Sequence, residues 1–209
     1  MDNICIAMAK GRLAKQAVKL FRRAGIDLPV NMLDSRKLIF SLPEENLEII
    51  LVKPADVPIY VEYGTADVGI VGKDTLLEEN RALYEVLDLK FGKCRFALAG
   101  LPDRKESLLQ RKVATKYPDF TRRLFKRKGE PVEIIKLNGS IELAPLTGLA
   151  DTILDIVQTG RTLKENGLIV YENIRELSAR LVVNKVSMKT SQKQITKIID
   201  ALENEVEGG

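Results

Sequence analysis

Short apolar segments alternate with segments of helical spacing along almost the whole chain. Apolar runs of strand length occupy residues 4–9, 47–52 and 152–157, and each is followed by a turn and a stretch with helical periodicity. Such alternation is typical of α/β proteins, because each buried strand is followed by a helix that packs on the sheet. The 209 residues are enough for one large domain or two small ones with real cores. The sequence therefore predicts an α/β fold.

The predicted elements form two groups, separated by one long extended region at residues 86–99. The first group has strands at 4–9, 37–42, 47–52 and 66–71 and helices at 13–24, 54–63 and 75–80. The second has strands at 112–115, 132–137 and 152–157 and helices at 118–128 and 140–148. Residues 169–173 and 178–186 are again extended, and 191–205 form an amphipathic helix with Ser191 as N-cap. We expect two α/β lobes with a cleft between them, one formed by residues 1–90 with 178–209 and the other by residues 91–177.

The composition excludes several classes of function. Histidine is absent, which removes histidine general bases, catalytic triads and histidine metal sites. No apolar run approaches the ~20 residues of a membrane span, and the first run, 4–9, is too short for a secretory signal. Cys5 and Cys94 lie in apolar segments without a CxxC partner, so we expect reduced core cysteines in a cytoplasmic protein with no membrane contact.

The positive charge is concentrated in one stretch. Residues 90–136 carry 14 Lys or Arg and 5 Asp or Glu, a balance of +9 within a net charge of +4. Aromatic residues make up 5% of the chain and tryptophan is absent, so few side chains could stack on bases and no nucleic-acid partner is expected. At residues 121–128, Leu124 and Phe125 would face inward and the charges would cover a solvated helix face. A field that attracts polyphosphates is the alternative.

A strand followed by a glycine turn and a helix start lies at residues 152–166. The turn is Thr159-Gly160-Arg161-Thr162, and Asp155 lies at its mouth. Main-chain N–H groups in such a turn can converge on a phosphate, the helix dipole favours an anion there, and glycine allows close approach. The threonine hydroxyls are further donors, and Asp155 could accept hydrogen bonds from sugar hydroxyls. An ordinary helix-capping turn is the alternative, because short motifs of this kind also occur without a ligand.

This turn resembles the phosphoribosyl-pyrophosphate loop of phosphoribosyltransferases, although that loop usually carries two adjacent acids and only Asp155 is present here. Together with six further segments in register, it makes the chain similar to the ATP phosphoribosyltransferase family, from Ile4 to about Val186. The length resembles the family's short form, which lacks a C-terminal regulatory domain. The six segments are Met8-Ala-Lys-Gly-Arg-Leu13, Ser35-Arg-Lys-Leu38, Pro54-Ala-Asp-Val-Pro58, Ala66-Asp-Val-Gly-Ile-Val-Gly-Lys-Asp74, Ala114-Thr-Lys-Tyr-Pro118 and Glu142-Leu-Ala-Pro-Leu-Thr-Gly-Leu-Ala-Asp151.

The resemblance implies a two-lobed, periplasmic-binding-protein-like (type II) fold with an active-site cleft between the lobes. It implies a glycosyltransferase of histidine biosynthesis that joins N1 of the adenine of ATP to C1 of phosphoribosyl pyrophosphate and releases pyrophosphate. Mg²⁺ would be bound mainly through the substrate pyrophosphate, with no dedicated protein site. The implied partners are a regulatory subunit related to histidyl-tRNA synthetase and a second copy of the chain, as a homodimer within a hetero-oligomer.

The chemistry is compatible with a chain that lacks histidine. Neutral adenine N1 carries a lone pair and no proton, so its attack needs no general base. In the first lobe, Arg12 and Arg36 are expected to act on the departing pyrophosphate, because the guanidinium fork suits two-point contact with phosphate, and Lys10 is a weaker helper. The helix dipole disfavours a cation in the first turn of a helix, so a functional role for Arg12 explains its position better than an ordinary surface charge does.

The second lobe is expected to bind the ribose phosphate. Asp155 is assigned to the ribose hydroxyls. The other residues expected to bind phosphoribosyl pyrophosphate are Gln158, Thr159, Gly160, Arg161 and Thr162.

Asp74 and Glu142 are weaker candidates, for contacts with ATP. Asp74 would otherwise be a helix N-cap, and Glu142 an ordinary charge at a helix start. The rival function is a two-lobed small-ligand binding module without catalysis, since fold alone does not decide function. A chain whose activity depends entirely on its partner is a third possibility.

Overall fold

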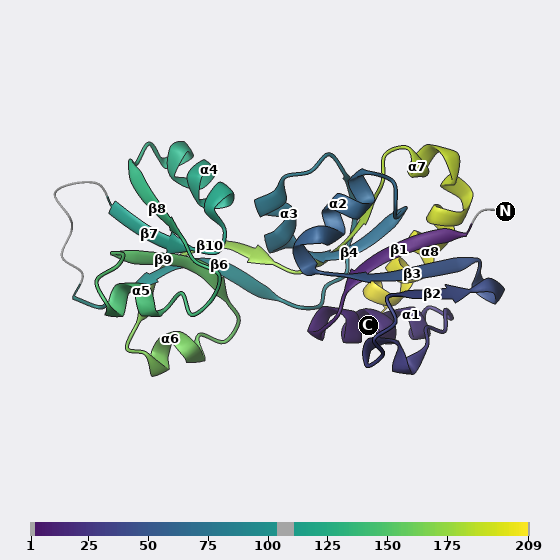
Figure 1. The fold of residues 1–209 in the computed structure, drawn as a ribbon, viewed down its shortest axis with the longest axis horizontal. Helices are drawn as coiled ribbons and strands as arrows, with labels where there is room; N and C mark the ends of the chain where they lie inside the picture. The colour runs from purple at the N-terminus through teal and green to yellow at the C-terminus, as the bar shows by residue number, and fades with distance from the viewer. Residues whose placement is uncertain (1–2, 104–110, 209) are drawn as a thin grey trace. The chain divides into compact units, whose positions relative to one another are not determined.

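The computed structural model describes residues 3–103 and 111–208 (Figure 1). The chain divides into two compact units, which we call lobe 1 and lobe 2. Lobe 1 is formed by Met1–Gly92 and Ser178–Gly209, and lobe 2 by Lys93–Leu177. The sequence prediction placed the first boundary after residue 90 and the second after residue 177.

Lobe 1 is built on a sheet of six strands among the described residues, in the order β2-β3-β1-β4-β11-β5. β1 pairs in parallel with β3 and β4, and the remaining pairs are antiparallel. β11 comes from the C-terminal segment and lies between β4 and β5, so both ends of the chain contribute to one sheet. The elements are β1 Ile4–Ala9, α1 Arg12–Arg23, η1 Val30–Leu33, β2 Ile39–Leu42, η2 Pro43–Glu45, β3 Leu47–Val52, η3 Pro54–Asp56, α2 Val57–Glu62, β4 Val68–Gly72, α3 Lys73–Glu79, β5 Tyr84–Asp88, β11 Ala179–Val183, α7 Ser187–Thr190 and α8 Gln192–Glu207.

Helices cover both faces of this sheet (Figure 1). Successive residues of a strand point to opposite faces, so β1 contributes to two cores. Ile6 and Met8 pack in the cluster that contains residues of α1 and α8, whereas Ala7 packs with residues of α2. A strand buried on both faces must be apolar throughout, which explains why residues 4–9 form an unbroken apolar run.

α1 ends with the pair of hydrogen bonds typical of a Schellman motif. The N–H of Gly25 donates to the carbonyl oxygen of Arg22 at 3.1 Å, and the N–H of Ile26 donates to that of Phe21 at 2.9 Å. Gly25 has a φ of 78°, which other residues adopt only with strain. Gly25 is therefore the residue at which the chain leaves this helix.

Lobe 2 is built on a sheet in the order β10-β6-β9-β7-β8, with α4 on one face and α5 and α6 on the other (Figure 1). β7 is parallel to β8 and β9, and β6 is antiparallel to β9 and β10. Phe96 of β6 stacks on Phe120 of α4 with ring centroids 4.4 Å apart. The elements described are β6 Cys94–Gly100, β7 Arg111–Thr115, α4 Pro118–Lys128, β8 Val132–Lys136, α5 Leu143–Leu146, β9 Thr152–Val157, α6 Arg161–Glu165 and β10 Ile169–Leu177.

The charged side chains of residues 121–128 form the solvated helix face that the sequence predicted. Leu124 and Phe125 of α4 are buried, whereas Lys126, Arg127 and Lys128 are exposed. The last three also lie at the C-terminal end of α4, where the helix dipole favours cations. The charges therefore stabilise and solubilise this helix.

Three predictions about secondary structure need correction. The extended region 86–99 is two strands, β5 and β6, which belong to different sheets because Lys90 and Gly92 have φ values of 57° and 64° and break the extended path. The helix predicted at 140–148 is the single turn α5, since Pro145 lacks an N–H and Gly148 has a φ of 73°. Ser191 occupies the N-cap position of α8, but in the described structure its side chain makes no capping hydrogen bond.

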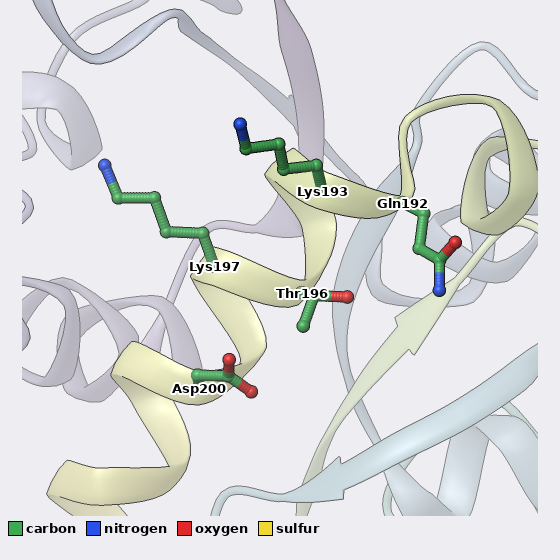
Figure 2. Close-up of a pocket in the computed structure, with 5 residues that line it drawn as sticks. All are labelled: Gln192, Lys193, Thr196, Lys197 and Asp200. Atoms are coloured by element: carbon green, nitrogen blue, oxygen red, sulfur yellow. The ribbon is translucent and has the colours of Figure 1, made fainter.

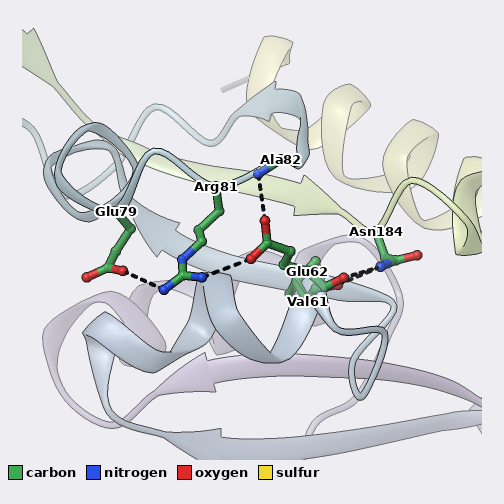
Figure 3. A network of polar contacts seen from close by, with 6 residues as sticks. All are labelled: Val61, Glu62, Glu79, Arg81, Ala82 and Asn184. Carbon is green, nitrogen blue, oxygen red and sulfur yellow. Dashed lines mark hydrogen bonds and ion pairs between the residues drawn. The ribbon is translucent and has the colours of Figure 1, made fainter.

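Asn184 joins the segment after β11 to the end of α2 (Figure 3). Its side-chain nitrogen donates to the carbonyl oxygens of Val61 at 2.7 Å and Glu62 at 3.1 Å, and its side-chain oxygen accepts the N–H groups of Val186 at 2.8 Å and Ser187 at 2.9 Å. The side chain is therefore fully used in a residue that is 6% exposed. These bonds hold the C-terminal segment on lobe 1.

The Glu62 carboxylate lies beside this junction and bridges two further segments (Figure 3). It accepts hydrogen bonds from Arg81 at 3.0 Å and from the N–H of Ala82 at 3.0 Å, and Arg81 also contacts Glu79 at 3.4 Å. The bond from Ala82 and then that from Arg81 lower the pKa of Glu62. The carboxylate therefore stays ionised under physiological conditions.

An ion-pair network surrounds Asp88 at the end of β5. Arg180 contacts Asp88 at 2.9 Å and Glu85 at 3.4 Å, and Lys73 contacts Glu85. The Ser178 hydroxyl donates to Asp88 at 2.7 Å. Partial burial acts to raise the pKa of Asp88, but the hydrogen bonds from Ser178 and the main chain and the charge of Arg180 together bring it below 3.8.

We expect Asp88→Asn to weaken the acid sensitivity of folding. A carboxyl whose pKa is lower in the folded state stabilises the fold above its unfolded pKa of 3.8, and this contribution is lost as the pH falls through the folded pKa. Urea unfolding at pH 7 and pH 3 should show a smaller difference in unfolding free energy for Asp88→Asn than for the unmodified protein. Equal differences in the two proteins would contradict the role of Asp88.

The two cysteines are free thiols and both are partly exposed, so they are less buried than predicted. Burial, followed by the charges of Glu48 and Asp67, raises the pKa of Cys5 to about 12. The N–H of Cys5 donates to the Asp67 carboxylate at 2.8 Å, which keeps that negative charge close. The Cys5 thiol is therefore protonated and weakly nucleophilic at neutral pH. None of the helices in the described ranges is long and apolar enough to span a bilayer.

Candidate active site

Two of the predicted pyrophosphate residues of lobe 1, Lys10 and Arg12, follow the carboxyl end of β1, and the hollow beside them is also lined by the end of β4, whereas Arg36 precedes β2. Ligand sites of α/β sheets form at this edge, because the strands end there and helices begin. Lys10 and Arg12 face the same hollow, which has a volume of about 200 Å³. Its other lining residues are Met8, Ala9, Leu13, Ala14, Pro54, Ile70, Val71 and Gly72.

Arg12 is the first residue of α1 and is exposed. The first turn, Arg12-Leu-Ala-Lys15, places two cations at the positive end of the helix dipole. The main-chain N–H groups and both cations favour an anionic ligand there. Gly11, with a φ of 123°, takes the chain directly from β1 into the helix, a conformation that suits glycine.

Lys10 links Arg36 to this pocket. The Lys10 ammonium group donates a hydrogen bond to the carbonyl oxygen of Ser35, the residue before Arg36. The Ser35 hydroxyl accepts the N–H of Lys37 at 3.0 Å, which shapes the turn that carries the exposed Arg36. The structure therefore places all three predicted cations on adjoining segments of lobe 1.

Asp74 lies in the first turn of α3, beside the same pocket. The N-cap of α3 is Gly72, and the helix begins at Lys73, so the alternative that Asp74 is the N-cap is wrong. The Asp74 carboxylate folds back over Gly72. A Cβ atom on Gly72 would lie less than 3.0 Å from Asp74 Oδ1, which is closer than Cβ atoms pack in real proteins. The Asp74 carboxylate can therefore take this position because residue 72 has no side chain.

The predicted phosphate turn of lobe 2 connects β9 to α6. β9 ends at Val157, and α6 begins at Arg161, within the stretch 152–166 in which the sequence predicted a strand, a turn and a helix start. Gly160 is the N-cap, with a φ of 76°. A Cβ atom on Gly160 would be 3.8 Å from Val157 Cγ1, an ordinary contact, so the glycine is needed for its backbone conformation and not for space.

Some polar groups of this turn bond to one another. The Thr159 hydroxyl accepts the N–H of Arg161 at 3.3 Å, and the Arg161 guanidinium contacts Glu165 at 2.8 Å. Asp155, which is half-buried, accepts the N–H of Ile156 at 2.8 Å. A phosphate in the turn would take the Arg161 N–H from Thr159, and the length of that bond indicates that it is weak.

The remaining candidates of lobe 2 lie close in the fold. Gln158 and Thr162 are exposed on the turn and on α6. Glu142 is the N-cap residue of α5, which packs in the same cluster as Leu163 of α6. The structure thus brings the lobe 2 candidates onto one face of one sheet, while Lys10, Arg12, Arg36 and Asp74 are gathered in lobe 1.

Sequence reasoning missed the apolar walls of the lobe 1 pocket. Leu13, Pro54 and Gly72 line it and were given no role. The position of Gly72 at the end of a buried strand and directly before a helix was the available signal, since a glycine there permits close approach of a ligand or a side chain.

Two larger hollows lie on other parts of lobe 1. One, of about 460 Å³, lies along α8, where the side chains of Lys193 and Lys197 extend in the same direction (Figure 2). The other, of about 290 Å³, is lined by residues such as Ile26, Leu47 and Ile198. The residues that line these two hollows include none of the predicted site residues in the described chain.

The chain is similar to proteins of one family along its whole length. A family model described as HisG, ATP phosphoribosyltransferase, matches residues 53–204. The ATP phosphoribosyltransferase of Halalkalibacterium halodurans is 55% identical over 209 residues, which are 100% of this chain and 99% of that protein. That of Caldanaerobacter subterraneus is 55% identical over 210 residues and covers 100% of both.

Solved structures agree on the fold. The ATP phosphoribosyl transferase (HisG:HisZ) complex from Thermotoga maritima contains a chain that is 33% identical, with a TM-score of 0.86 over 99% of this chain and 100% of that one. The periplasmic VFT2 domain of Bordetella pertussis BvgS, at 15% identity and a TM-score of 0.57, shares the fold alone. The chain therefore has the two-lobed fold of periplasmic-binding-protein-like domains, and it belongs to the ATP phosphoribosyltransferase family.

Proposed function

We propose that the chain joins N1 of the adenine of ATP to C1 of phosphoribosyl pyrophosphate, with the lobe 1 pocket acting on pyrophosphate and the β9–α6 turn binding the ribose phosphate. Family membership supports the reaction. The observation that carries the assignment of the pocket is that Lys10 and Arg12 line one hollow at a strand end and a helix start. The rival reading, a binding module without catalysis, is not favoured by the relatives.

The reaction breaks one bond and forms one. The N1 lone pair of adenine forms the new bond to C1, and the electrons of the C1–O bond leave with pyrophosphate. No proton is transferred in the attack, so the protein has to align two polyanions and stabilise the charge that develops on the leaving oxygen. Cations on a rigid strand end and helix start can do both.

Arg12 and Arg36 are proposed to stabilise the leaving pyrophosphate, with help from Lys10. Arginine can bind two phosphate oxygens at once, and its charge does not titrate near neutral pH. Arg12 is held by the first turn of α1, and the contact of Lys10 with Ser35 holds the segment that carries Arg36.

The turn in lobe 2 is proposed to bind the ribose 5-phosphate. Gln158, Thr159, Gly160, Arg161 and Thr162 would supply main-chain and side-chain donors to the phosphate, and Asp155 would accept hydrogen bonds from the ribose hydroxyls. Asp74 and Glu142 are proposed contacts of ATP.

Mg²⁺ is proposed to enter with the pyrophosphate. In the described ranges, no three acidic or cysteine side chains come together as a metal site. The donors near the lobe 1 pocket are mainly cations, which suit the oxygens of a metal-bound pyrophosphate better than the metal itself. The ion would supply charge neutralisation of the pyrophosphate.

The chain is further proposed to act in the cytoplasm as a homodimer within a hetero-oligomer that contains a regulatory subunit. The related chain from Thermotoga maritima was solved in a HisG:HisZ complex, which supports a partner of this kind.

An assay for the product tests the proposal. ATP, phosphoribosyl pyrophosphate and Mg²⁺ should give phosphoribosyl-ATP and pyrophosphate. The product is monitored by the ultraviolet absorbance of the substituted adenine. The rate should be compared with and without the regulatory subunit. Substrate-dependent increases in melting temperature without product under either condition would instead favour a binding module.

A further inference from the structure

Leu13 lies between two glycines at the wall of the lobe 1 pocket. It follows Arg12 on α1, lines the pocket and packs against the core of lobe 1. A Cβ atom on Gly72 would be 3.7 Å from Leu13 Cδ1, an ordinary contact. A Cβ atom on Gly92 would lie less than 3.0 Å from Leu13 Cδ2, which is closer than Cβ atoms pack in real proteins. The space that Leu13 occupies therefore depends on the missing side chain of Gly92.

The main chain around Gly92 is held in place. The N–H of Leu89 donates to the carbonyl oxygen of Ala179 at 3.0 Å, and the N–H of Ala179 donates to that of Phe91 at 2.9 Å. Gly92 itself has a φ of 64° and is the last residue of lobe 1 before the chain enters lobe 2 at Lys93. These bonds anchor the residues just before Gly92, so an added methyl group would be accommodated most easily by a movement of the Leu13 side chain, whose end it meets.

The body of α1 is held as well. Ala14 and Ala17 are 1% and 0% exposed, against the sheet. A methyl group on Gly92 must therefore displace the Leu13 side chain, which lines the pocket, or the first turn of α1, which carries Arg12. Both movements change the geometry that a pyrophosphate would meet.

We propose that Gly92 is a positioning residue for the pyrophosphate pocket. Its missing side chain leaves the space in which the Leu13 side chain forms the pocket wall, and this keeps the first turn of α1, which carries Arg12, in place. This inference rests on the proposed function. Gly92 does not contact the substrates in this proposal and acts only through Leu13. A shift of about 1 Å in a positioned group can lower a rate by as much as ~10²-fold, so one methyl group is enough for a measurable effect.

The test compares Gly92→Ala with Gly25→Ala. Gly25 follows the other end of α1 with a φ of 78°, and a Cβ atom there would meet nothing within 4 Å, so the control has the same backbone strain of about 1 kcal/mol without the overlap. We expect Gly92→Ala to lower kcat/KM at least about 10-fold and to weaken pyrophosphate binding, measured by calorimetry with Mg²⁺, while Gly25→Ala changes neither. Equal effects of the two variants would overturn the proposal.

The double variant Leu13→Ala/Gly92→Ala tests the route through Leu13. It should have nearly the kcat/KM and pyrophosphate affinity of Leu13→Ala alone, because the overlap no longer exists. Additive losses would mean that Gly92 acts through the backbone and would overturn the proposal. If Gly92→Ala does not fold, Leu13→Phe enlarges the same contact from the helix side with Gly92 intact; it should weaken pyrophosphate binding too, and unchanged binding would contradict the role of this contact.

The calorimetry separates this inference from the proposed function. Unmodified protein that binds pyrophosphate but forms no product would refute the transferase, whereas the comparison of pyrophosphate affinities would still decide the role of Gly92. Normal turnover with equal affinities in Gly92→Ala and Gly25→Ala would refute the inference alone.

Discussion

Arg12→Ala is expected to lower kcat by about 10²–10³-fold while the protein stays folded, which corresponds to about 3–4 kcal/mol of lost transition-state stabilisation. The reason is that pyrophosphate gains charge as the C1–O bond breaks, and Arg12 lines the pocket proposed for it. The measurement is kcat at saturating ATP and phosphoribosyl pyrophosphate, with circular dichroism to verify the fold.

Arg22→Ala is the matched control for this prediction. Arg22 lies in the last turn of the same helix and makes an exposed ion pair with Asp27 at 3.5 Å, so its removal should leave kcat unchanged and stability nearly so. Arg12→Lys keeps the charge but not the two-point contact, and it should recover only part of the rate. If Arg12→Ala retained near-full kcat, the assignment of Arg12 to the leaving group would be wrong.

Asn184→Ala is expected to cause the largest loss of stability among single polar substitutions proposed for this protein. It removes four hydrogen bonds and takes the acceptor from the N–H groups of Val186 and Ser187 and a donor from the carbonyl oxygens of Val61 and Glu62, of which that of Val61 keeps the N–H of Gly64 at 3.1 Å. The loss of these buried and partly buried bonds costs about 2–4 kcal/mol in total. For a chain of this size the melting temperature should fall by roughly 5–15 °C in calorimetry.

Asn204→Ala provides the comparison, because Asn204 is exposed on α8. Its melting temperature should change by no more than about 2 °C. Turnover of Asn184→Ala well below its melting temperature should remain, because Asn184 is not among the residues that line the lobe 1 pocket. Equal melting temperatures for the two variants would show that the Asn184 bonds contribute little.

Much of the fold could be predicted from the sequence, because local signals and tertiary structure agree. β1, β9 and α4 have the predicted bounds, since each is an apolar run or an amphipathic stretch with clear ends such as Pro118 and Gly129. The break between β5 and β6 could not be predicted, because residues 86–99 are extended on both sides of it. What separates the two strands is their membership of different sheets, which depends on partners far along the chain.

The candidate site shows the same division. The positions of Lys10 and Arg12 at a strand end and of Gly160 at a helix start were accessible from strand and glycine patterns. The contacts of Leu13 with Gly72 and Gly92 were not, because they join residues that only the folded chain brings together. Whether the assigned residues bind the substrates stays a prediction until the variants are measured.

A nascent chain that has left the ribosome as far as Leu177 contains all of lobe 2 but lacks β11, the strand that pairs with both β4 and β5. Lobe 2 can thus complete its sheet during synthesis, whereas lobe 1 has to wait for the last segment. Until then, or in any product truncated before Ala179, β4 and β5 each expose an edge that can pair with strands of other chains. Premature termination late in the message would therefore yield an aggregation-prone protein instead of a smaller functional one.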